Sequence, residues 1–317
     1  TMERRRRARG GSTLPEGIRI GLPRALLYHW FAPAWEAFLR ALGGVPVVSP
    51  PTNKALLALG QQNAPEEVCL PVKLFLGHAL HLAGDCDLLL VPHLVSLEEA
   101  AFTCPKFMGL PDLVRTALPG RRTVPFRVDV RAGRPWEAAM REVACALGLR
   151  GRRVERAWRA AVAAQRDYEE EFRARGEGGG AFLAVLGHPY CLYDPFLNMD
   201  LLARLAAAGH RVVTPEMLPA PAIERGLAEL PKALFWSFGR RQIGAANHLL
   251  AAGECLGLIH VTAFACGPES LVGELIERTA ARHRVPLLRL VLDEHTGEAG
   301  LLTRIEAFVE MLGRRAR

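Results

Sequence analysis

Several features of membrane, secreted and nucleotide-binding proteins are missing from this sequence. Its apolar stretches, such as Leu88–Val91 and Leu287–Leu292, which is interrupted by Arg289, are far shorter than the roughly 20 residues that a membrane-spanning helix needs. No apolar segment directly follows the basic N-terminus, so we expect no secretory signal. No Gly-x-Gly-x-x-Gly or Walker sequence occurs at a strand-to-helix turn, which argues against a dinucleotide or phosphate-loop site. We therefore expect a cytoplasmic protein that does not interact with membranes.

Net charge is almost absent from the body of the chain, although the whole sequence carries +7. The first 16 residues contribute a net +3 and the last four residues another +3, which leaves +1 for the rest. A charge run at a terminus is usually a solvated tail, and the body shows no basic stripe interleaved with aromatic residues. We therefore interpret residues 1–16 as a disordered basic tail and expect no nucleic-acid partner.

Closely paired cysteines are absent as well. No Cys-x-x-Cys knuckle of the kind that structural zinc sites usually use occurs. The number of cysteines is odd, and a cytosolic protein seldom forms a disulfide framework. Each cysteine is therefore either a small buried side chain or a ligand or nucleophile. The seven are Cys69, Cys86, Cys104, Cys145, Cys191, Cys255 and Cys266.

Strand and helix patterns alternate along the chain. The strand patterns lie at 18–23, 45–49, 87–92, 123–129, 182–187, 211–215, 233–237, 255–262 and 286–293, and the helical patterns between them include 24–42, 69–83, 151–175 and 195–208. This alternation predicts parallel sheets covered on both faces. We predict two doubly wound α/β domains of Rossmann-like (flavodoxin-like) type, at 17–150 and 178–317, with a helical linker at 151–177 and a crevice between the domains.

Position within this pattern separates the cysteines into two groups, because sites in open parallel sheets lie at the carboxyl ends of strands. Cys86 and Cys255 precede strands and Cys145 lies in an amphipathic helix, so we interpret these three as small buried side chains. The other four lie in loops after strands or at the start of a helix, and are candidate ligands: Cys69, Cys104, Cys191 and Cys266.

Proline follows three of the candidate cysteines within two residues, in Cys69-Leu-Pro, Cys104-Pro-Lys and Cys266-Gly-Pro. Proline suits the first turn of a helix, so we expect the sulfurs of Cys69 and Cys266 near helix N-termini, which favour a thiolate or an anionic cluster. Lysine is rare, with four among 40 basic residues, yet Lys73 and Lys106 lie within four residues of these cysteines. We interpret both as ammonium groups near the sulfurs.

Three thiolates from separate loops leave three chemical interpretations open: a structural zinc site, an iron–sulfur cluster, or a catalytic cysteine with bystanders. Scattered single cysteines suit a cube-shaped cluster better than a zinc knuckle, with three protein thiolates and one open iron. The open iron could take Cys191, a small ligand, substrate or solvent. Buried thiols without any ligand role are the competing interpretation.

Seven stretches of the sequence resemble the 2-hydroxyacyl-CoA dehydratase activase-related proteins, and together they span about residues 18–313. They are Ile20–Tyr28, Ser49–Lys54, Cys69–Lys73, Cys104–Phe107, His188–Asn198, Ala265–Ser270 and Asp293–Gly300. This module is in turn similar to the cluster-binding subunits of 2-hydroxyacyl-CoA dehydratases and benzoyl-CoA reductases. Those subunits hold a [4Fe-4S] cluster through three cysteines between α/β domains.

The resemblance implies that Cys69, Cys104 and Cys266 hold a [4Fe-4S] cluster, with Cys191 as a fourth ligand or a neighbour. It also implies a low-potential electron-transfer component, or a reductive dehydratase or reductase component, that works with an ATP-dependent activase on an acyl-CoA-type substrate. Whether the chain is itself a lyase or an oxidoreductase, and whether it forms a homodimer, stays open. The alternatives are an iron–sulfur carrier or assembly protein and a metal-free two-domain module that closes on a small molecule.

Further candidates lie in loops that follow strands. In His188–Asn198, the side chains of Tyr190, Asp194 and Asn198 could face the cluster or a substrate, although Asp194 before a proline equally suits a helix N-cap. Behind Cys266, we expect two residues to cap and orient the loop, Glu269 and Ser270. In the last loop, Asp293 and His295 could bind a polar ligand or relay a proton, whereas Thr296 or Glu294 could cap the next helix. Two histidines read as ordinary helix-face residues, His78 and His81.

Overall fold

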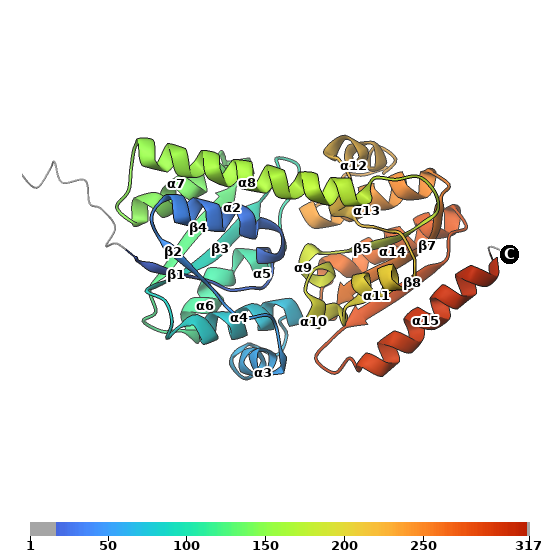
Figure 1. Cartoon of the computed structure of the whole chain (residues 1–317), viewed down its shortest axis with the longest axis horizontal. Coiled ribbons are helices and arrows are strands. Elements are labelled where there is room, and N and C mark those ends of the chain that lie inside the picture. The colour runs from blue at the N-terminus through green and yellow to red at the C-terminus, as the bar shows by residue number, and fades with distance from the viewer. Residues whose placement is uncertain (1–16, 316–317) are drawn as a thin grey trace, which may run out of the picture.

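The computed structural model describes residues 17–315; the predicted tail at residues 1–16 and residues 316–317 lie outside the described part. Two parallel four-stranded sheets form the frame of the molecule (Figure 1). The first has the order β2-β1-β3-β4 and the second the order β6-β5-β7-β8, so both repeat one topology. This order is that of doubly wound flavodoxin-like folds, and the predicted Rossmann-like α/β class is confirmed. The strands are β1 (Arg19–Leu22), β2 (Val45–Val48), β3 (Leu88–Ser96), β4 (Thr123–Asp129), β5 (Phe182–Gly187), β6 (Val212–Val213), β7 (Cys255–Ala263) and β8 (Leu287–Leu292).

Helices connect the parallel strands within each half of the molecule. We call β1 to α7 the first half and β5 to α15 the second half. The helices of the first half are α2 (Tyr28–Ala41), α3 (Lys54–Asn63), α4 (Leu70–Leu82), α5 (Pro105–Met108), α6 (Leu110–Ala117) and α7 (Trp136–Ala146), with a 3-10 turn η1 (Val130–Ala132). Those of the second half are α9 (Pro189–Leu192), α10 (Pro195–Asn198), α11 (Leu201–Ala207), α12 (Ala220–Leu227), α13 (Ser237–Ala251), α14 (Gly267–Arg282) and α15 (Glu298–Arg315), with a 3-10 turn η2 (Pro215–Met217).

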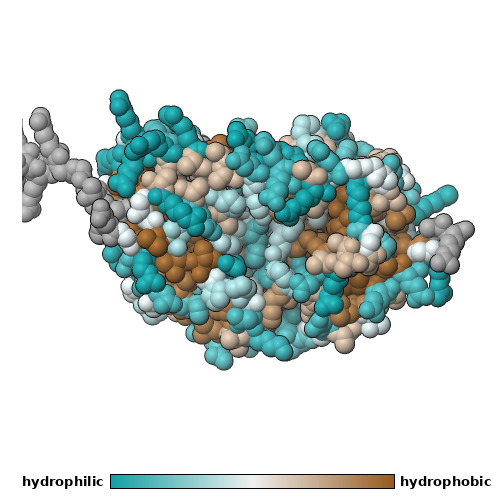
Figure 2. Space-filling model, in the orientation of Figure 1, coloured by the Kyte–Doolittle hydropathy of each residue, from teal (hydrophilic) through white to brown (hydrophobic). Residues whose placement is uncertain are grey.

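The long helix α8 (Arg152–Gly176) occupies the predicted linker and runs from the first half toward the second (Figure 1). It packs along α2, where the Trp30 ring lies 5.6 Å from the ring of Tyr168 and 5.3 Å from that of Phe172. On the face seen in Figure 2, two hydrophobic patches flank a mainly hydrophilic strip where the halves meet. Among residues 17–315, no helix combines the length and apolarity that crossing a bilayer would require.

Three predictions about individual elements are wrong. Residues 233–237 do not form a strand: Trp236 makes a single bridge to Phe102, and α13 begins at Ser237. The helix expected from residue 24 begins only at Tyr28, because Leu26 adopts φ +51°, outside the helical region. The helix expected at 195–208 is broken between α10 and α11, where Met199 and Asp200 have φ +54° and +60°.

Candidate functional site

The three candidate ligand cysteines occupy the same local position in three different helices. Cys69, Cys104 and Cys266 are the N-cap residues of α4, α5 and α14, and each helix has proline in its first two positions. Proline fits there because the first N–H groups of a helix have no partner inside it. Two of the helices belong to the first half and α14 belongs to the second. The site therefore needs both halves.

All three cysteine side chains line one cavity of about 300 Å³ between the two halves. Lys106 and Tyr190 line the same cavity, as does His188. Much of the remaining wall is apolar or aromatic, and includes Leu26, Val72, Phe107, Trp236 and Phe238. A concave, mainly apolar pocket with a few convergent reactive groups is the usual form of a ligand or cofactor site.

Two wall residues of this cavity have an unusual backbone conformation. Leu26 and Ala265 have φ of +51° and +62°, a left-handed conformation that residues with a Cβ rarely adopt. Ala265 directly precedes Cys266, so this conformation sets the direction from which the cysteine enters α14. Backbone outliers of this kind concentrate at functional sites.

Burial controls the acidity of the three thiols. It raises the pKa of Cys69 to about 11 and also raises the pKa of Cys104 and of Cys266. The backbone amides of the first helical turns act in the opposite direction, as does Lys106 near Cys69 and Cys104, but burial outweighs them. In the protein alone, the thiols are therefore protonated at neutral pH. The thiolate expected from the helix N-termini would form only with a bound cation, which would release the protons.

In the part of the chain that is described, no three His, Cys, Asp or Glu side chains are grouped so as to hold a metal ion. A structural zinc ion needs all its ligands at about 2.0–2.3 Å from one centre, so the zinc interpretation gains no support from the geometry. In a cube-shaped cluster the thiolates bind different iron atoms. That arrangement does not require the sulfurs to converge on one point.

A buried carboxylate lies directly behind Cys266. Glu269 is 2% exposed, and its carboxylate lies 2.6 Å from Nε2 of Gln242, 2.9 Å from Nε2 of His260 and 3.1 Å from Nδ1 of His188. Burial by itself would raise the pKa of Glu269, but the neighbouring histidines hold it below the usual value. The predicted partner in this loop, Ser270, is exposed, and its hydroxyl donates to the carbonyl of Cys266.

The sequence analysis did not single out His188 and His260 as partners of Glu269. His188 directly follows β5 and is the first residue of the stretch His188–Asn198. This position at the carboxyl end of a strand could have indicated that His188 belongs to the site. His260 lies inside β7 and is fully buried, and only the fold brings it to the carboxylate.

Some residues of the segment from His188 to Asn198 line the cysteine cavity, whereas others lie behind its wall. The Tyr190 ring lines the cavity and stacks on His188, with centroids 4.8 Å apart and planes at 16°. Cys191 is fully buried and does not line the cavity, and burial raises its pKa well above the usual value. Asn198 donates to the carbonyls of Cys191 and Leu192 at 3.0 and 2.6 Å. Asn198 therefore supports the loop from behind rather than facing the cavity.

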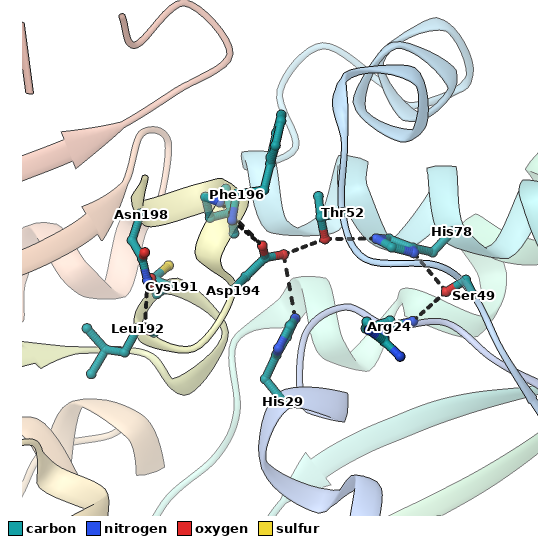
Figure 3. Close-up of polar contacts among 11 residues, drawn as sticks. Arg24, His29, Ser49, Thr52, His78, Cys191, Leu192, Asp194, Phe196 and Asn198 are labelled. Carbon is teal, nitrogen blue, oxygen red and sulfur yellow. Dashed lines mark hydrogen bonds and ion pairs between the residues drawn. The ribbon is translucent and has the colours of Figure 1, made fainter. Parts of the chain in front are cut away.

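Asp194 caps α10, as its position before a proline suggested, and also joins the two halves. One carboxylate oxygen accepts from the amides of Phe196 and Leu197, and the other accepts from the Thr52 hydroxyl at 2.6 Å (Figure 3). Thr52 in turn lies 3.1 Å from Nε2 of His78. His78 is fully buried, contrary to its interpretation as an ordinary helix-face residue, whereas His81 is exposed.

Of the two predicted lysines and the predicted site residues in the last loop, only one lines the cysteine cavity. Lys73 does not line the cysteine cavity but pairs with Glu294 of the second half. Lys106 does line the cavity, with Nζ 3.5 Å from the carbonyl of Glu67. Within the last loop, the Thr296 hydroxyl donates a hydrogen bond to the Asp293 carboxylate at 2.8 Å. His295 is exposed and does not line the cavity.

The three cysteines interpreted as structural residues differ in their surroundings. Cys86 and Cys255 are buried, as expected. The expectation for Cys145 is wrong, because its side chain is exposed. The buried face of α7 consists of Ala139, Met140, Val143 and Ala144, and Cys145 is the next residue around the helix.

Comparison with known protein families supports the resemblance seen in the sequence. Residues 19–218 match a family described as CoA enzyme activase uncharacterised domain (DUF2229). No curated protein matches the chain. The matched region covers more than half of the sequence and includes two of the three cavity cysteines, Cys69 and Cys104. The chain therefore belongs to the CoA enzyme activase uncharacterised domain family, in agreement with its resemblance to 2-hydroxyacyl-CoA dehydratase activase-related proteins.

Proposed function

We propose that Cys69, Cys104 and Cys266 hold a [4Fe-4S] cluster in the cavity between the two halves. In this proposal the protein is a low-potential electron-transfer component, or a component of a reductive dehydratase or reductase, and works with an ATP-dependent activase on an acyl-CoA-type substrate. One observation carries the proposal: three N-cap cysteines, supplied by both halves, line a single cavity.

The residues present suit such a cluster. Thiolates are the soft ligands that iron–sulfur clusters use, and each thiol lies at the N-terminus of a helix, where anionic groups are stabilised. Lys106 adds a positive charge at the cavity wall. A bound cluster would supply single-electron chemistry, which amino-acid side chains cannot easily provide.

The chain's own contribution would be to exclude water and to orient what binds. Aromatic residues form part of the wall, including Phe107, Tyr190, Trp236 and Phe238. Burial raises the pKa of Tyr190 well above its usual value, so this residue offers a neutral phenol rather than a second anion. Cys191 is buried in α9 and does not line the cavity, so we expect it to be a neighbour of the cluster rather than its fourth ligand.

The proposal is tested by anaerobic purification, an absorption spectrum, and iron and sulfide counts. We expect a brown protein with about four irons per chain. The Cys69→Ala, Cys104→Ala and Cys266→Ala variants should each lose most of the iron. Cys145→Ala is the matched control, because this exposed thiol lies outside the cavity and its replacement should leave the iron count unchanged.

Three further results would separate the alternatives. Unchanged iron in Cys191→Ala would identify that thiol as a neighbour rather than a ligand. A colourless protein without iron, or one that contains zinc, would contradict the cluster and favour a metal-free binding module. Transfer of the whole cluster to an apo-acceptor protein would instead favour a carrier role.

A further inference from the structure

A second cavity, of about 380 Å³, lies elsewhere along the boundary between the two halves. It shares no lining residue with the cysteine cavity. Its walls come from the loops after β1, β2 and β5, together with α2 and α8. Three stretches that resemble the activase-related proteins therefore meet here: Ile20–Tyr28, Ser49–Lys54 and His188–Asn198. None of them contains a cysteine that lines the first cavity.

An unpaired cation lines this second cavity. Arg24 is partly buried, and no carboxylate of residues 17–315 lies within ion-pair distance of its guanidinium. Its Nε is buried and has no hydrogen-bond partner. The guanidinium lies 5.8 Å from the centre of the Tyr28 ring. Polar groups that are withdrawn from water are normally hydrogen-bonded, so the buried Nε lacks the partner that its position calls for, although the guanidinium also interacts with Tyr28.

A second nitrogen without a hydrogen-bond partner lines the same cavity. Nε2 of His29 is buried and lies 3.5 Å from Oδ2 of Asp194, beyond good hydrogen-bond geometry (Figure 3). His29 also contacts the Asp194 carboxylate as an ion-pair partner, and the Thr52 hydroxyl and two backbone amides donate to the same carboxylate. Asp194 would therefore keep three donors if His29 turned toward a bound group.

Three of the four tyrosines in the chain form an aromatic wall of this cavity. Their hydroxyls are engaged elsewhere: Tyr28 donates to Glu36 at 2.9 Å, Tyr168 to the carbonyl of His29 at 3.4 Å, and Tyr193 to Glu216 at 2.8 Å. With the hydroxyls occupied, the rings can offer their apolar surfaces to a ligand. Flat apolar groups pack well against such rings.

We propose that this cavity binds a small molecule that combines a flat apolar body with one anionic group, either a carboxylate or a phosphate. Arg24 is the counter-ion of the anionic group and His29 a second polar contact, while the tyrosine rings pack against the body. Arginine suits this role because its planar guanidinium matches both oxyanions. The site lies apart from the cysteines, so it goes beyond the proposed cluster and does not depend on it.

The test is calorimetric titration of the purified protein with phenylacetate, phenyl phosphate and phenylacetamide. The first two probes distinguish a carboxylate from a phosphate ligand, and the third is an uncharged isostere of the first. We expect at least one anion to bind, and phenylacetamide to bind at least tenfold more weakly. Arg24→Gln should weaken anion binding about tenfold or more, equivalent to about 1.4 kcal/mol. Arg122→Gln, an exposed arginine outside the cavity, is the matched control and should bind as the wild type does.

Three outcomes would overturn the proposal: neither anion binds at millimolar concentrations, phenylacetamide binds as tightly as phenylacetate, or Arg24→Gln retains wild-type affinity. If circular dichroism shows that Arg24→Gln is unfolded, His29→Gln carries the same test. Cys104→Ala separates the two proposals, because it should lose iron but keep anion binding. Loss of anion binding in that folded variant would contradict an independent site.

Discussion

The hydroxyl of Thr52 donates to Oδ2 of Asp194 at 2.6 Å, although the two residues are 142 positions apart. This hydrogen bond belongs to a series that runs from Arg24 to Asp194, and its two ends determine which atom donates at each step. The amide of Arg24 donates to Ser49, which lies 2.8 Å from Nδ1 of His78, while Nε2 of His78 lies 3.1 Å from Thr52. Because the amide can only donate and the carboxylate can only accept, His78 carries its proton on Nε2. One continuous polar path therefore joins the two halves (Figure 3).

Removal of the Thr52 hydroxyl should destabilise the protein. Thr52→Val keeps the side-chain shape but leaves the buried carboxylate of Asp194 without one donor, and an unsatisfied buried group costs about 1–3 kcal/mol. Urea denaturation measures the change in the free energy of unfolding. Thr52→Ser should recover most of the loss, and Thr116→Val, at an exposed hydroxyl, is a control that should change little. A Thr52→Val protein as stable as the wild type would argue against this path.

The same path predicts how stability depends on pH. Burial lowers the pKa of His78 from its usual 6.5 to about 4, so the folded protein keeps this ring neutral. The unfolded chain binds the proton first, so the contribution of His78 is complete above about pH 6.5. It falls by up to about 1.4 kcal/mol per pH unit as the pH decreases toward 4. Nitrogen NMR of the ring should show the neutral Nε2–H form down to about pH 5; titration near 6.5 would contradict the prediction.

The ion pair between Lys73 and Glu294 should couple the first half to the second. Both side chains are largely withdrawn from water, at 14% and 13% exposure, so water screens the pair less than it does at the surface. Burial tends to raise the pKa of Glu294, but Lys73 holds it below the usual value, so the contribution is lost on acidification. We expect a double-mutant cycle with Lys73→Met and Glu294→Gln to give a coupling energy of about 1 kcal/mol or more.

The exposed pair of Arg115 and Asp112 provides the matched comparison for that cycle. Its side chains are 74% and 70% exposed, and such pairs typically contribute less than about 0.5 kcal/mol. Equal coupling energies for the two pairs would show that the contact between the halves adds nothing beyond a surface interaction.

Cysteine reactivity should report the different environments of the thiols. In protein free of metal at pH 8, iodoacetamide should modify Cys145 first, because it is exposed. Cys69, Cys104 and Cys266 should react more slowly, since burial raises the pKa of each and the thiolate is the reactive form. Peptide mass spectrometry over time measures each rate, and Cys145→Ser identifies the fast site. Modification of the cavity cysteines at the rate of Cys145 would contradict the burial described here.

The sequence was sufficient to predict the fold class because the alternation of strands and helices is a local property. It also placed Cys69 and Cys266 at helix starts, through the prolines that follow them. It could not predict the helix break at Met199 and Asp200, because neither residue signals a left-handed backbone conformation strongly. The hydrogen-bond partners of His78 could not be predicted from the sequence for another reason. Their contacts join segments that are distant in sequence, and hydropathy patterns carry no information about such pairings.

The division of the cysteines between two halves also sets an order of events during synthesis. Cys69 and Cys104 leave the ribosome early, but Cys266 follows only after the second half is nearly complete. Domains generally fold as units during synthesis, the N-terminal one first, so we expect the first half to begin folding while the second is still being made. During that interval, a nascent chain presents two thiols without the third. The cofactor proposed here would therefore have to be inserted after translation, into a chain whose two halves have already come together.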